Sequence, residues 1–276
     1  MIVHRTKEIL KKYHLQAKKK YGQNFLINAH ILDKIVETSE IDKTSGVIEI
    51  GPGIGTLTEV LAINSKRVLC YEIDKDMIEV LNDTLSNYDN IKIICNDFLK
   101  VNLKDDIEKY LKDCENIIVV ANLPYYITTP ILFKLMKENI QRMIIMVQKE
   151  VGMRLVGKPN TKDYNALSVI MAYKTKSKIF AHVSRNSFFP APNVDSVLLD
   201  IKLLKSDSIV NNEGEFLKFV ETIFMQRRKT LVNNLARNFD KEKIIEILST
   251  LGYEKDIRAE QLSLTEIVNI YKTLYE

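Results

Sequence analysis

The stretch VIEIGPGIGT, residues 47–56, decides the fold. Its first four residues form an apolar, largely β-branched run typical of a buried strand. The glycines at positions 51, 53 and 55 allow a tight turn, and the segment 56–63 that follows has the amphipathic pattern of a helix. A strand, a glycine-rich turn and a helix in this order are typical of the first unit of an α/β sheet that holds a ligand at the helix start.

Similar apolar runs recur along the first half of the chain, separated by segments long enough for a helix. They are residues 47–50, 67–73, 91–95, 117–121 and 143–147. This alternation predicts a parallel sheet with helices on both faces. Two later runs, residues 179–183 and 194–203, flank a proline-rich loop and predict an antiparallel pair at the edge. We therefore expect a Rossmann-like α/β sheet that is mostly parallel, with an antiparallel edge strand.

Charge and pattern change toward the two ends of the chain. Beyond residue 205 the pattern is only helical, in residues 216–225, 229–239, 241–248 and 265–274. Residues 1–24 carry seven Lys/Arg and one Glu, whereas the whole chain has a net charge of +4. Such an arm predicts a polyanion partner, with a frayed, solvated terminus as the alternative. We expect a basic arm (1–24), a sheet domain (25–205) and a small all-α domain (206–276) that binds RNA.

The composition argues against several classes of protein. No apolar run reaches the roughly 18 residues of a membrane span, and the N-terminus lacks the apolar core of a signal peptide. We therefore expect a cytoplasmic protein with no membrane partner. Cys70, Cys95 and Cys114 form no C-x-x-C pair, and the four histidines are isolated in the sequence. Neither a disulfide nor a metal site is expected.

Acidic residues follow the second and third predicted strands, Glu72 and Asp97. Because the carboxyl ends of parallel strands meet at one edge, both should lie beside Gly51 and Gly53. A carboxylate there can accept hydrogen bonds from ribose hydroxyls or a base amine, so these residues predict a nucleoside pocket. For each acid alone, a helix cap or a solvated charge in a loop is the alternative. Thr56 replaces the third glycine of a dinucleotide fingerprint and no G-K-[ST] follows, which favours S-adenosylmethionine over NAD or ATP.

The tetrapeptide Asn122-Leu123-Pro124-Tyr125 follows the fourth strand, at the same edge. An exocyclic adenine amine is a poor nucleophile because its lone pair is delocalised. The amide oxygen of Asn122 and the carbonyl of Leu123 can each accept one N–H, which turns the lone pair toward a methyl donor. Pro124 fixes the backbone, and Tyr125 can stack on an extruded base. The tetrapeptide therefore predicts methyl transfer to an adenine amine without a strong general base.

These motifs resemble those of the ribosomal RNA adenine N6,N6-dimethyltransferases, which modify two adjacent adenines near the 3′ end of small-subunit rRNA. The resemblance covers essentially the whole chain. The motifs that carry it are KYGQNFL (20–26), EIGPG (49–53), Glu72, ND (96–97), NLPY (122–125), QKEV (148–151), FFPAPNVDS (188–196) and QRRKTL (226–231). A departure is Tyr126, where many members of the family carry Asn.

The resemblance implies that Asn24, Leu26 and Asn122 contact the methyl donor and that Phe188 offers a second ring to the flipped adenine. It also implies a partner, small-subunit rRNA in an immature ribosomal subunit, and a late step of subunit biogenesis, carried out by a monomer. The basic cluster Arg227, Arg228 and Lys229 is predicted to contact RNA phosphates.

Three alternatives remain open. The macrolide-resistance methyltransferases, which modify a large-subunit rRNA adenine, share Asn24 and the type of tetrapeptide. The F-x-P-x-P-x-V-D loop and the QRRKTL stretch favour the small-subunit enzyme. A factor that mainly binds immature subunits is the second alternative, and the intact tetrapeptide argues against a purely structural role. A nucleotide-dependent oxidoreductase is the third, and Thr56 disfavours it.

Overall fold

The computed structural model describes residues 2–18, 21–204 and 209–275. Contacts divide the chain into two compact units, Met1–Gly152 with Lys178–Leu203, and Met153–Ser177 with Leu204–Glu276. This division differs from the expected domains, because residues 153–177 cluster with the C-terminal helices. Tyr173 shows the physical reason, since its ring centroid lies 4.9 Å from that of Phe216 in the core of the second unit.

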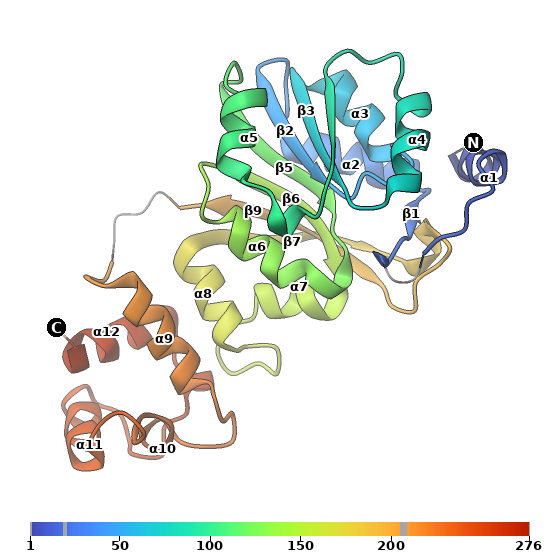
Figure 1. Cartoon of the computed structure of the whole chain (residues 1–276). Helices are drawn as coiled ribbons and strands as arrows, with labels where there is room; N and C mark the ends of the chain where they lie inside the picture. The colour runs from blue at the N-terminus through green and yellow to red at the C-terminus, as the bar shows by residue number, and fades with distance from the viewer. Residues whose placement is uncertain (1, 19–20, 205–208, 276) are drawn as a thin grey trace. The chain divides into compact units, whose positions relative to one another are not determined.

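Within the described residues, seven strands form one sheet in the order β4-β3-β2-β5-β6-β9-β7 (Figure 1). Their bounds are β2 (Ser45–Ile50), β3 (Arg67–Glu72), β4 (Ile91–Cys95), β5 (Asn116–Asn122), β6 (Arg142–Gln148), β7 (Thr175–Val183) and β9 (Ser196–Leu203). The strands from β4 to β6 pair in parallel, and β9 runs antiparallel to β6. The predicted Rossmann-like sheet is confirmed, with its antiparallel strand one position inside the edge formed by β7.

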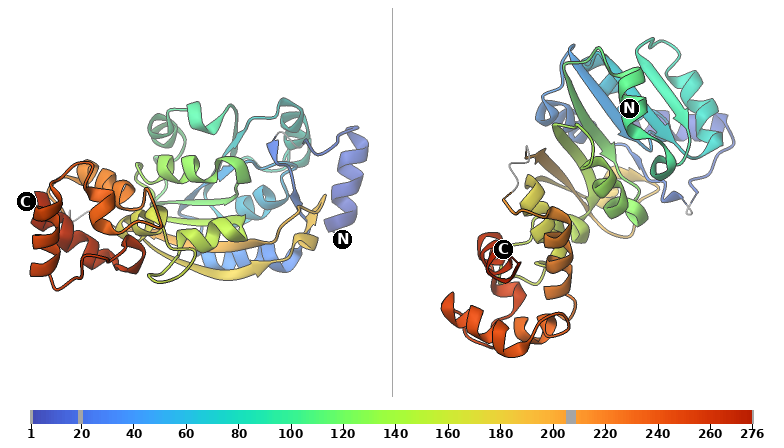
Figure 2. Two further views of the ribbon diagram at one scale, coloured as in Figure 1. Left: turned by 90° about the horizontal axis from the view of Figure 1, so that it is seen from below. Right: turned by 60° about the vertical axis from the view of Figure 1, so that its left-hand side comes forward.

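Helices connect the strands of the first unit and cover the two faces of its sheet (Figure 2). The helices of this unit are α1 (Ile2–Lys12), α2 (Ala29–Ser39), α3 (Thr56–Asn64), α4 (Lys75–Thr84), η2 (Phe98–Lys100), α5 (Leu103–Tyr110), η3 (Tyr125–Ile127), α6 (Thr128–Leu135) and η4 (Arg185–Ser187). The helix α7 (Lys149–Leu155) begins in the first unit and ends in the second. Central strand residues such as Val47, Cys70 and Val120 are fully buried between these layers. Two short strands, β1 (Phe25–Leu26) and β8 (Phe188–Phe189), pair separately.

A buried ion pair joins β6 to β9. Arg142 donates to both carboxylate oxygens of Asp200, at 2.7 and 3.0 Å, and Asp200 is 2% exposed. The guanidinium also contacts Glu40, at 2.9 Å. A bidentate pair of this kind is geometrically specific. It therefore fixes the register in which Arg142 lies opposite Lys202 and Gln148 lies opposite Ser196.

The second unit is all-helical. It contains α8 (Ala166–Lys174), α9 (Glu213–Ile223), α10 (Leu231–Leu235), α11 (Lys241–Thr250), η5 (Ala259–Gln261) and α12 (Leu264–Tyr275). The predicted helix over residues 229–239 was wrong in its extent. Thr230 caps α10, accepting a hydrogen bond from the Asn233 N–H, so the preceding basic residues lie in a turn.

Residues 2–12 of the N-terminal arm form the helix α1, which is packed rather than frayed. Leu10 of α1 is 7% exposed and lies in a cluster with Phe25, Ile54 and Met77. Basic residues of the arm meet acids of α3 and α4 in ion pairs, which join Arg5 to Glu59, Lys12 to Asp83 and Lys18 to Asp74. Across the described part of the chain, every helix is too short or too polar to cross a membrane.

Candidate active site

A cavity opens at the carboxyl ends of the strands, where the strand order reverses between β2 and β5. This is the position at which open α/β sheets bind ligands. The cavity is lined by the predicted donor-binding residues and the whole tetrapeptide: Asn24, Leu26, Gly51, Gly53, Glu72, Asp97, Asn122, Leu123, Pro124 and Tyr125. Segments from the arm and from four strand ends therefore converge on one site.

The glycine turn requires residues without a side chain. Gly51 and Gly53 have φ of +72° and +59°, in the left-handed region that L side chains rarely adopt. A Cβ atom on Gly53 would lie 3.0 Å from the ring of Phe25, and one on Gly51 would lie 3.9 Å from Cγ of Pro124. The turn after β2 and the tetrapeptide after β5 are therefore neighbours, and bare backbone faces the cavity between them.

Glu72 is held in one orientation by backbone N–H groups. Its Oε2 accepts from Gly53, at 3.2 Å, and its Oε1 accepts from Asp74, at 2.8 Å. Burial raises the pKa of Glu72, and these two hydrogen bonds oppose the rise. Each oxygen keeps a second lone pair, so the fixed carboxylate can still accept from a ligand hydroxyl.

Asp97 both caps η2 and lines the cavity. Its side chain accepts from the Leu99 N–H at 3.0 Å, so the cap expected as the alternative is present. The neighbouring Phe98 is 5% exposed and packs edge-to-face against Tyr71, with 5.1 Å between ring centroids. An acid and an aromatic ring therefore share the end of β4, as the nucleoside pocket requires.

Asn122 is oriented by the arm. Its Nδ2 donates to the backbone carbonyl of Asn24 at 3.2 Å, which leaves Oδ1 as the acceptor of the side chain. The next residue, Leu123, donates its N–H to the carbonyl of Met146 on β6, at 3.1 Å. The tetrapeptide is thus fixed from both sides before any substrate arrives.

The ring of Tyr125 is anchored at its hydroxyl. The hydroxyl shares a 2.7 Å hydrogen bond with Oγ of Ser196, the fully buried first residue of β9. Burial raises the pKa of Tyr125, and the hydrogen bond to Ser196 opposes the rise. Tyr126, the departure noted in the sequence, also lines the cavity and is 57% exposed.

Phe188 does not line this cavity. It is 2% exposed, lies opposite Leu26 in the β1–β8 pair and packs in the hydrophobic core. Stacking of Phe188 on a flipped adenine stays a prediction, and it would require the β1–β8 pair to move. The aromatic residues that line the cavity as it stands are Tyr21, Phe25, Tyr71, Phe98, Tyr125 and Tyr126.

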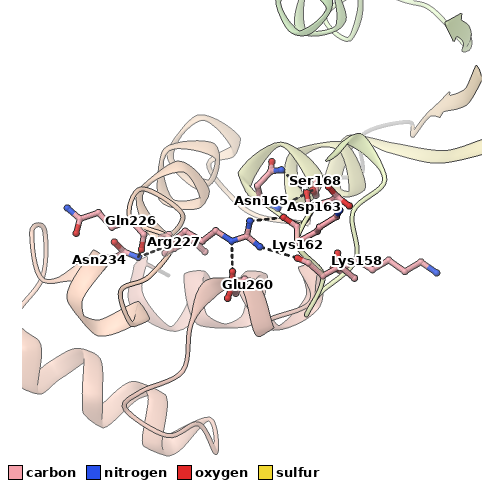
Figure 3. A network of polar contacts seen from close by, with 11 residues as sticks. Lys158, Lys162, Asp163, Asn165, Ser168, Gln226, Arg227, Asn234 and Glu260 are labelled. Atoms are coloured by element: carbon pink, nitrogen blue, oxygen red, sulfur yellow. Dashed lines mark hydrogen bonds and ion pairs between the residues drawn. The ribbon is translucent and has the colours of Figure 1, made fainter. Parts of the chain in front are cut away.

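The basic cluster of the second unit divides into two kinds of residue, and Figure 3 shows the polar contacts of the first, Arg227. Arg227 donates to Glu260 at 2.7 Å, to the Lys162 carbonyl at 2.6 Å and to the Thr161 carbonyl at 3.3 Å. Arg228 and Lys229 are exposed and make no ion pair or side-chain hydrogen bond with the described residues. Arg227 therefore fastens two loops together, whereas its two neighbours present uncompensated charge.

Several residues that shape the site were not predicted. Ser196 belongs to a quoted motif but had no role, and Gln23 and Asp74 connect the arm to α4. Glu49 lines the cavity from β2, where burial raises its pKa to about 8, and it belongs to a quoted motif in which it had no role of its own. A glutamate between two isoleucines in a buried strand was the available signal for Glu49. Among residues 2–18, 21–204 and 209–275, no group of His, Cys, Asp and Glu could hold a metal ion.

The sheet, the glycine turn with its fixed carboxylate and the oriented amide together define a Rossmann-like, S-adenosylmethionine-dependent methyltransferase. The sequence profile of the ribosomal RNA adenine dimethylase family matches residues 14–276, and the chain belongs to this family.

Relatives extend over nearly the whole chain. The ribosomal RNA small subunit methyltransferase A of Staphylococcus aureus strain Newman is 46% identical over 278 residues, which cover 97% of this chain and 93% of that protein. A dimethyladenosine transferase from Plasmodium falciparum has a similar structure, with a TM-score of 0.77, 26% identity and coverage of 91% and 97%. The 23S rRNA methyltransferase ErmE shares the fold at 23% identity and a TM-score of 0.71, with coverage of 92% and 100%.

Proposed function

We propose that this chain transfers methyl groups from S-adenosylmethionine to N6 of two adjacent adenines in the 3′-terminal hairpin of small-subunit rRNA, giving N6,N6-dimethyladenosine. Family membership and the relatives named as small-subunit methyltransferases support this choice of RNA. The observation that carries the chemistry is the orientation of Asn122, whose amide nitrogen is bound by the Asn24 carbonyl beside the glycine turn.

The residues around the cavity fit the methyl donor. Bare backbone at Gly51 and Gly53 leaves room for a ligand, and Glu72 presents a carboxylate held by two backbone N–H groups. Asp97, Asn24 of the arm and Leu26 of β1 complete the predicted donor contacts. When bound, the donor supplies an electrophilic methyl group on a sulfonium cation. An acidic, glycine-lined cleft favours such a cation.

The tetrapeptide prepares the acceptor. Oδ1 of Asn122 and the carbonyl of Leu123 each accept one N–H of the adenine amine, so the lone pair turns toward the methyl group. Tyr125, anchored by Ser196, stacks on the base. The amine becomes acidic only after it has gained a methyl group, and its proton then passes to water. A monomethylated amine keeps one N–H, so one of the two acceptors can still bind it and orient the nitrogen for the second transfer.

The setting of the reaction follows from the partner. Arg228 and Lys229 contact rRNA phosphates, because their charges are unpaired among the described residues. The chain acts in the cytoplasm, as a monomer, on small subunits that are still immature. Methylation accompanies a late step of their assembly.

The test uses immature small subunits that lack the modification. The protein is incubated with them and with isotope-labelled S-adenosylmethionine, and the rRNA nucleosides are analysed by mass spectrometry. Labelled N6,N6-dimethyladenosine in small-subunit rRNA is the expected result. Label found only when large-subunit RNA is supplied would indicate the macrolide-resistance type. Binding of the protein to subunits with no transfer of label to their rRNA would indicate an assembly factor.

A further inference from the structure

Asp74 links the donor site to the arm. Its side chain is 3% exposed and lies at the N-terminus of α4. One oxygen, Oδ2, accepts from Nε2 of Gln23 at 2.8 Å, and the other, Oδ1, accepts from Nζ of Lys18 at 2.7 Å. The backbone N–H of Asp74 donates to Glu72, at 2.8 Å. One residue thus contacts both the predicted ribose acceptor and two side chains of the arm.

Gln23 has both ends of its amide occupied. Nε2 donates to Asp74, and Oε1 accepts from the backbone N–H of Lys18 at 2.8 Å. The residue that follows in the chain is Asn24, whose Nδ2 donates to the Gly22 carbonyl at 3.0 Å. The carbonyl of Asn24 is the group that accepts from Asn122. A continuous path of bonded contacts therefore runs from the buried carboxylate to the catalytic amide.

The neighbouring acid provides a contrast. Asp76 also contacts the ammonium of Lys18, but its side chain is 55% exposed and makes no described contact with Gln23. Two carboxylates therefore share one cation, and only one of them bonds to the segment that holds Asn24. Charge attraction to Lys18 and fixation of Gln23 can be separated by changing one acid at a time.

We propose that Asp74 is a positioning residue for methyl transfer, which holds Gln23 and through it the Asn24 carbonyl that orients Asn122. This inference rests on the proposed function and deepens it. Fixing the acceptor before the substrate binds removes the need to order it during the reaction. The contribution of the arm to catalysis is then geometric, in addition to any attraction of its charges for RNA.

The test compares three variants of the full chain. Asp74→Asn keeps the size of the side chain but points an N–H at Gln23 or at Lys18. Gln23→Ala removes the hydrogen bond between Gln23 and Asp74 and leaves Asp74 as the cap of α4. Asp76→Asn is the matched control. Thermal unfolding reports folding, amide hydrogen exchange of residues 21–26 reports fixation of the segment, and kcat and KM are measured with unmethylated small subunits.

We expect Asp74→Asn and Gln23→Ala to accelerate exchange in residues 21–26 and to lower kcat, at saturating donor and RNA, by about 10- to 100-fold. Asp76→Asn should resemble the unmodified chain in both measurements. The inference is overturned if exchange is unchanged, if kcat is unchanged while exchange accelerates, or if Asp76→Asn loses as much activity. If the unmodified chain methylates no RNA, the proposed function is wrong. The exchange data would still decide whether the hydrogen bond between Asp74 and Gln23 fixes residues 21–26.

Discussion

The amide of Asn122 and the backbone carbonyl of Asn24 form a 3.2 Å hydrogen bond across 98 residues of sequence. Because the nitrogen is the donor in this contact, the oxygen of the side chain is left to accept from a substrate amine. The sheet supplies the catalytic side chain, and the N-terminal segment supplies its orientation. An active site assembled in this way depends on both parts of the first unit.

Replacement of Asn122 by Ala removes the oriented acceptor. We expect kcat to fall by about 100-fold, comparable to the loss of one group of an oxyanion hole, because the lone pair of the adenine amine is no longer directed. Binding of S-adenosylmethionine, measured by calorimetry, should weaken less than kcat falls, because Gly51, Gly53 and Glu72 still line the donor site. A variant that retains most of its kcat with small-subunit rRNA would contradict the role given to this amide.

Replacement of Glu72 by Gln tests the donor site. The amide keeps the shape of the side chain but places an N–H donor against either Gly53 or Asp74, whose N–H groups now donate to the carboxylate. Charge-assisted hydrogen bonds of this kind contribute about 1.5–3 kcal/mol. We therefore expect the Kd for S-adenosylmethionine to rise by about 10- to 100-fold in isothermal titration. Equal affinity in the two proteins would exclude a donor contact at this position.

Glu49 predicts how stability depends on pH. Burial raises its pKa to about 8, from 4.5, so the folded chain keeps a proton that the unfolded chain loses between these values. The stability contributed by this group is fully present below about pH 4.5 and is lost as pH rises toward 8, with a slope of at most about 1.4 kcal/mol per pH unit. Burial of Glu72 acts in the same direction.

The variant Glu49→Gln should therefore flatten the pH dependence, because the amide is neutral at every pH. Urea unfolding at pH 5, 6, 7 and 8 measures the change. Glu79→Gln, an exposed substitution on α4, serves as the control and should retain the original dependence. Parallel curves for the original chain and Glu49→Gln would show that Glu49 is ionised in the folded state.

The basic cluster of the second unit predicts two different phenotypes. Arg227→Gln removes hydrogen bonds that join the turn before α10 to Glu260 and to the loop at residues 161–162. We expect a loss of at most about 1 kcal/mol in the stability of the unit, because these contacts are exposed and water can take the place of the guanidinium. Arg228→Gln should leave stability unchanged.

Salt dependence separates the two residues further. Loss of one phosphate contact reduces the slope of log K against log salt by about 0.7–0.9. Arg228→Gln and Lys229→Gln should each show this change in rRNA binding, and Arg227→Gln should keep the original slope. If Arg227→Gln alone altered the slope, the residue would have to leave Glu260 and bind RNA.

The edge of the sheet that carries the site could be predicted because parallel strands end together. Glu72 and Asp97 were placed beside Gly51 from strand order alone, and all three line one cavity. Periodicity also identified the sheet and the helical C-terminal region. These features could be predicted because the apolar pattern of each segment indicates its own secondary structure and burial.

Contacts between distant segments could not be predicted in the same way. Nothing near Ser196 indicates that it meets Tyr125, and nothing near Gln23 points to Asp74. The helix predicted over residues 229–239 was too long because its apolar pattern gave no sign that Thr230 begins a short helix. Residues 153–177 were expected in the sheet domain, whereas contacts group them with the C-terminal helices, because the ring that packs on Tyr173 belongs to Phe216, far along the sequence.

The Arg142–Asp200 ion pair fixes the register between β6 and β9, and the hydrogen bond between Tyr125 and Ser196 depends on this register. Side chains of a strand alternate between its faces, so a shift of β9 by one residue would turn Ser196 away from Tyr125 and bring Val197 to its place. The ring of Tyr125 would then lose its tether. An ion pair near one end of β6 thereby fixes which residue of β9 lies beside the active site at the other end.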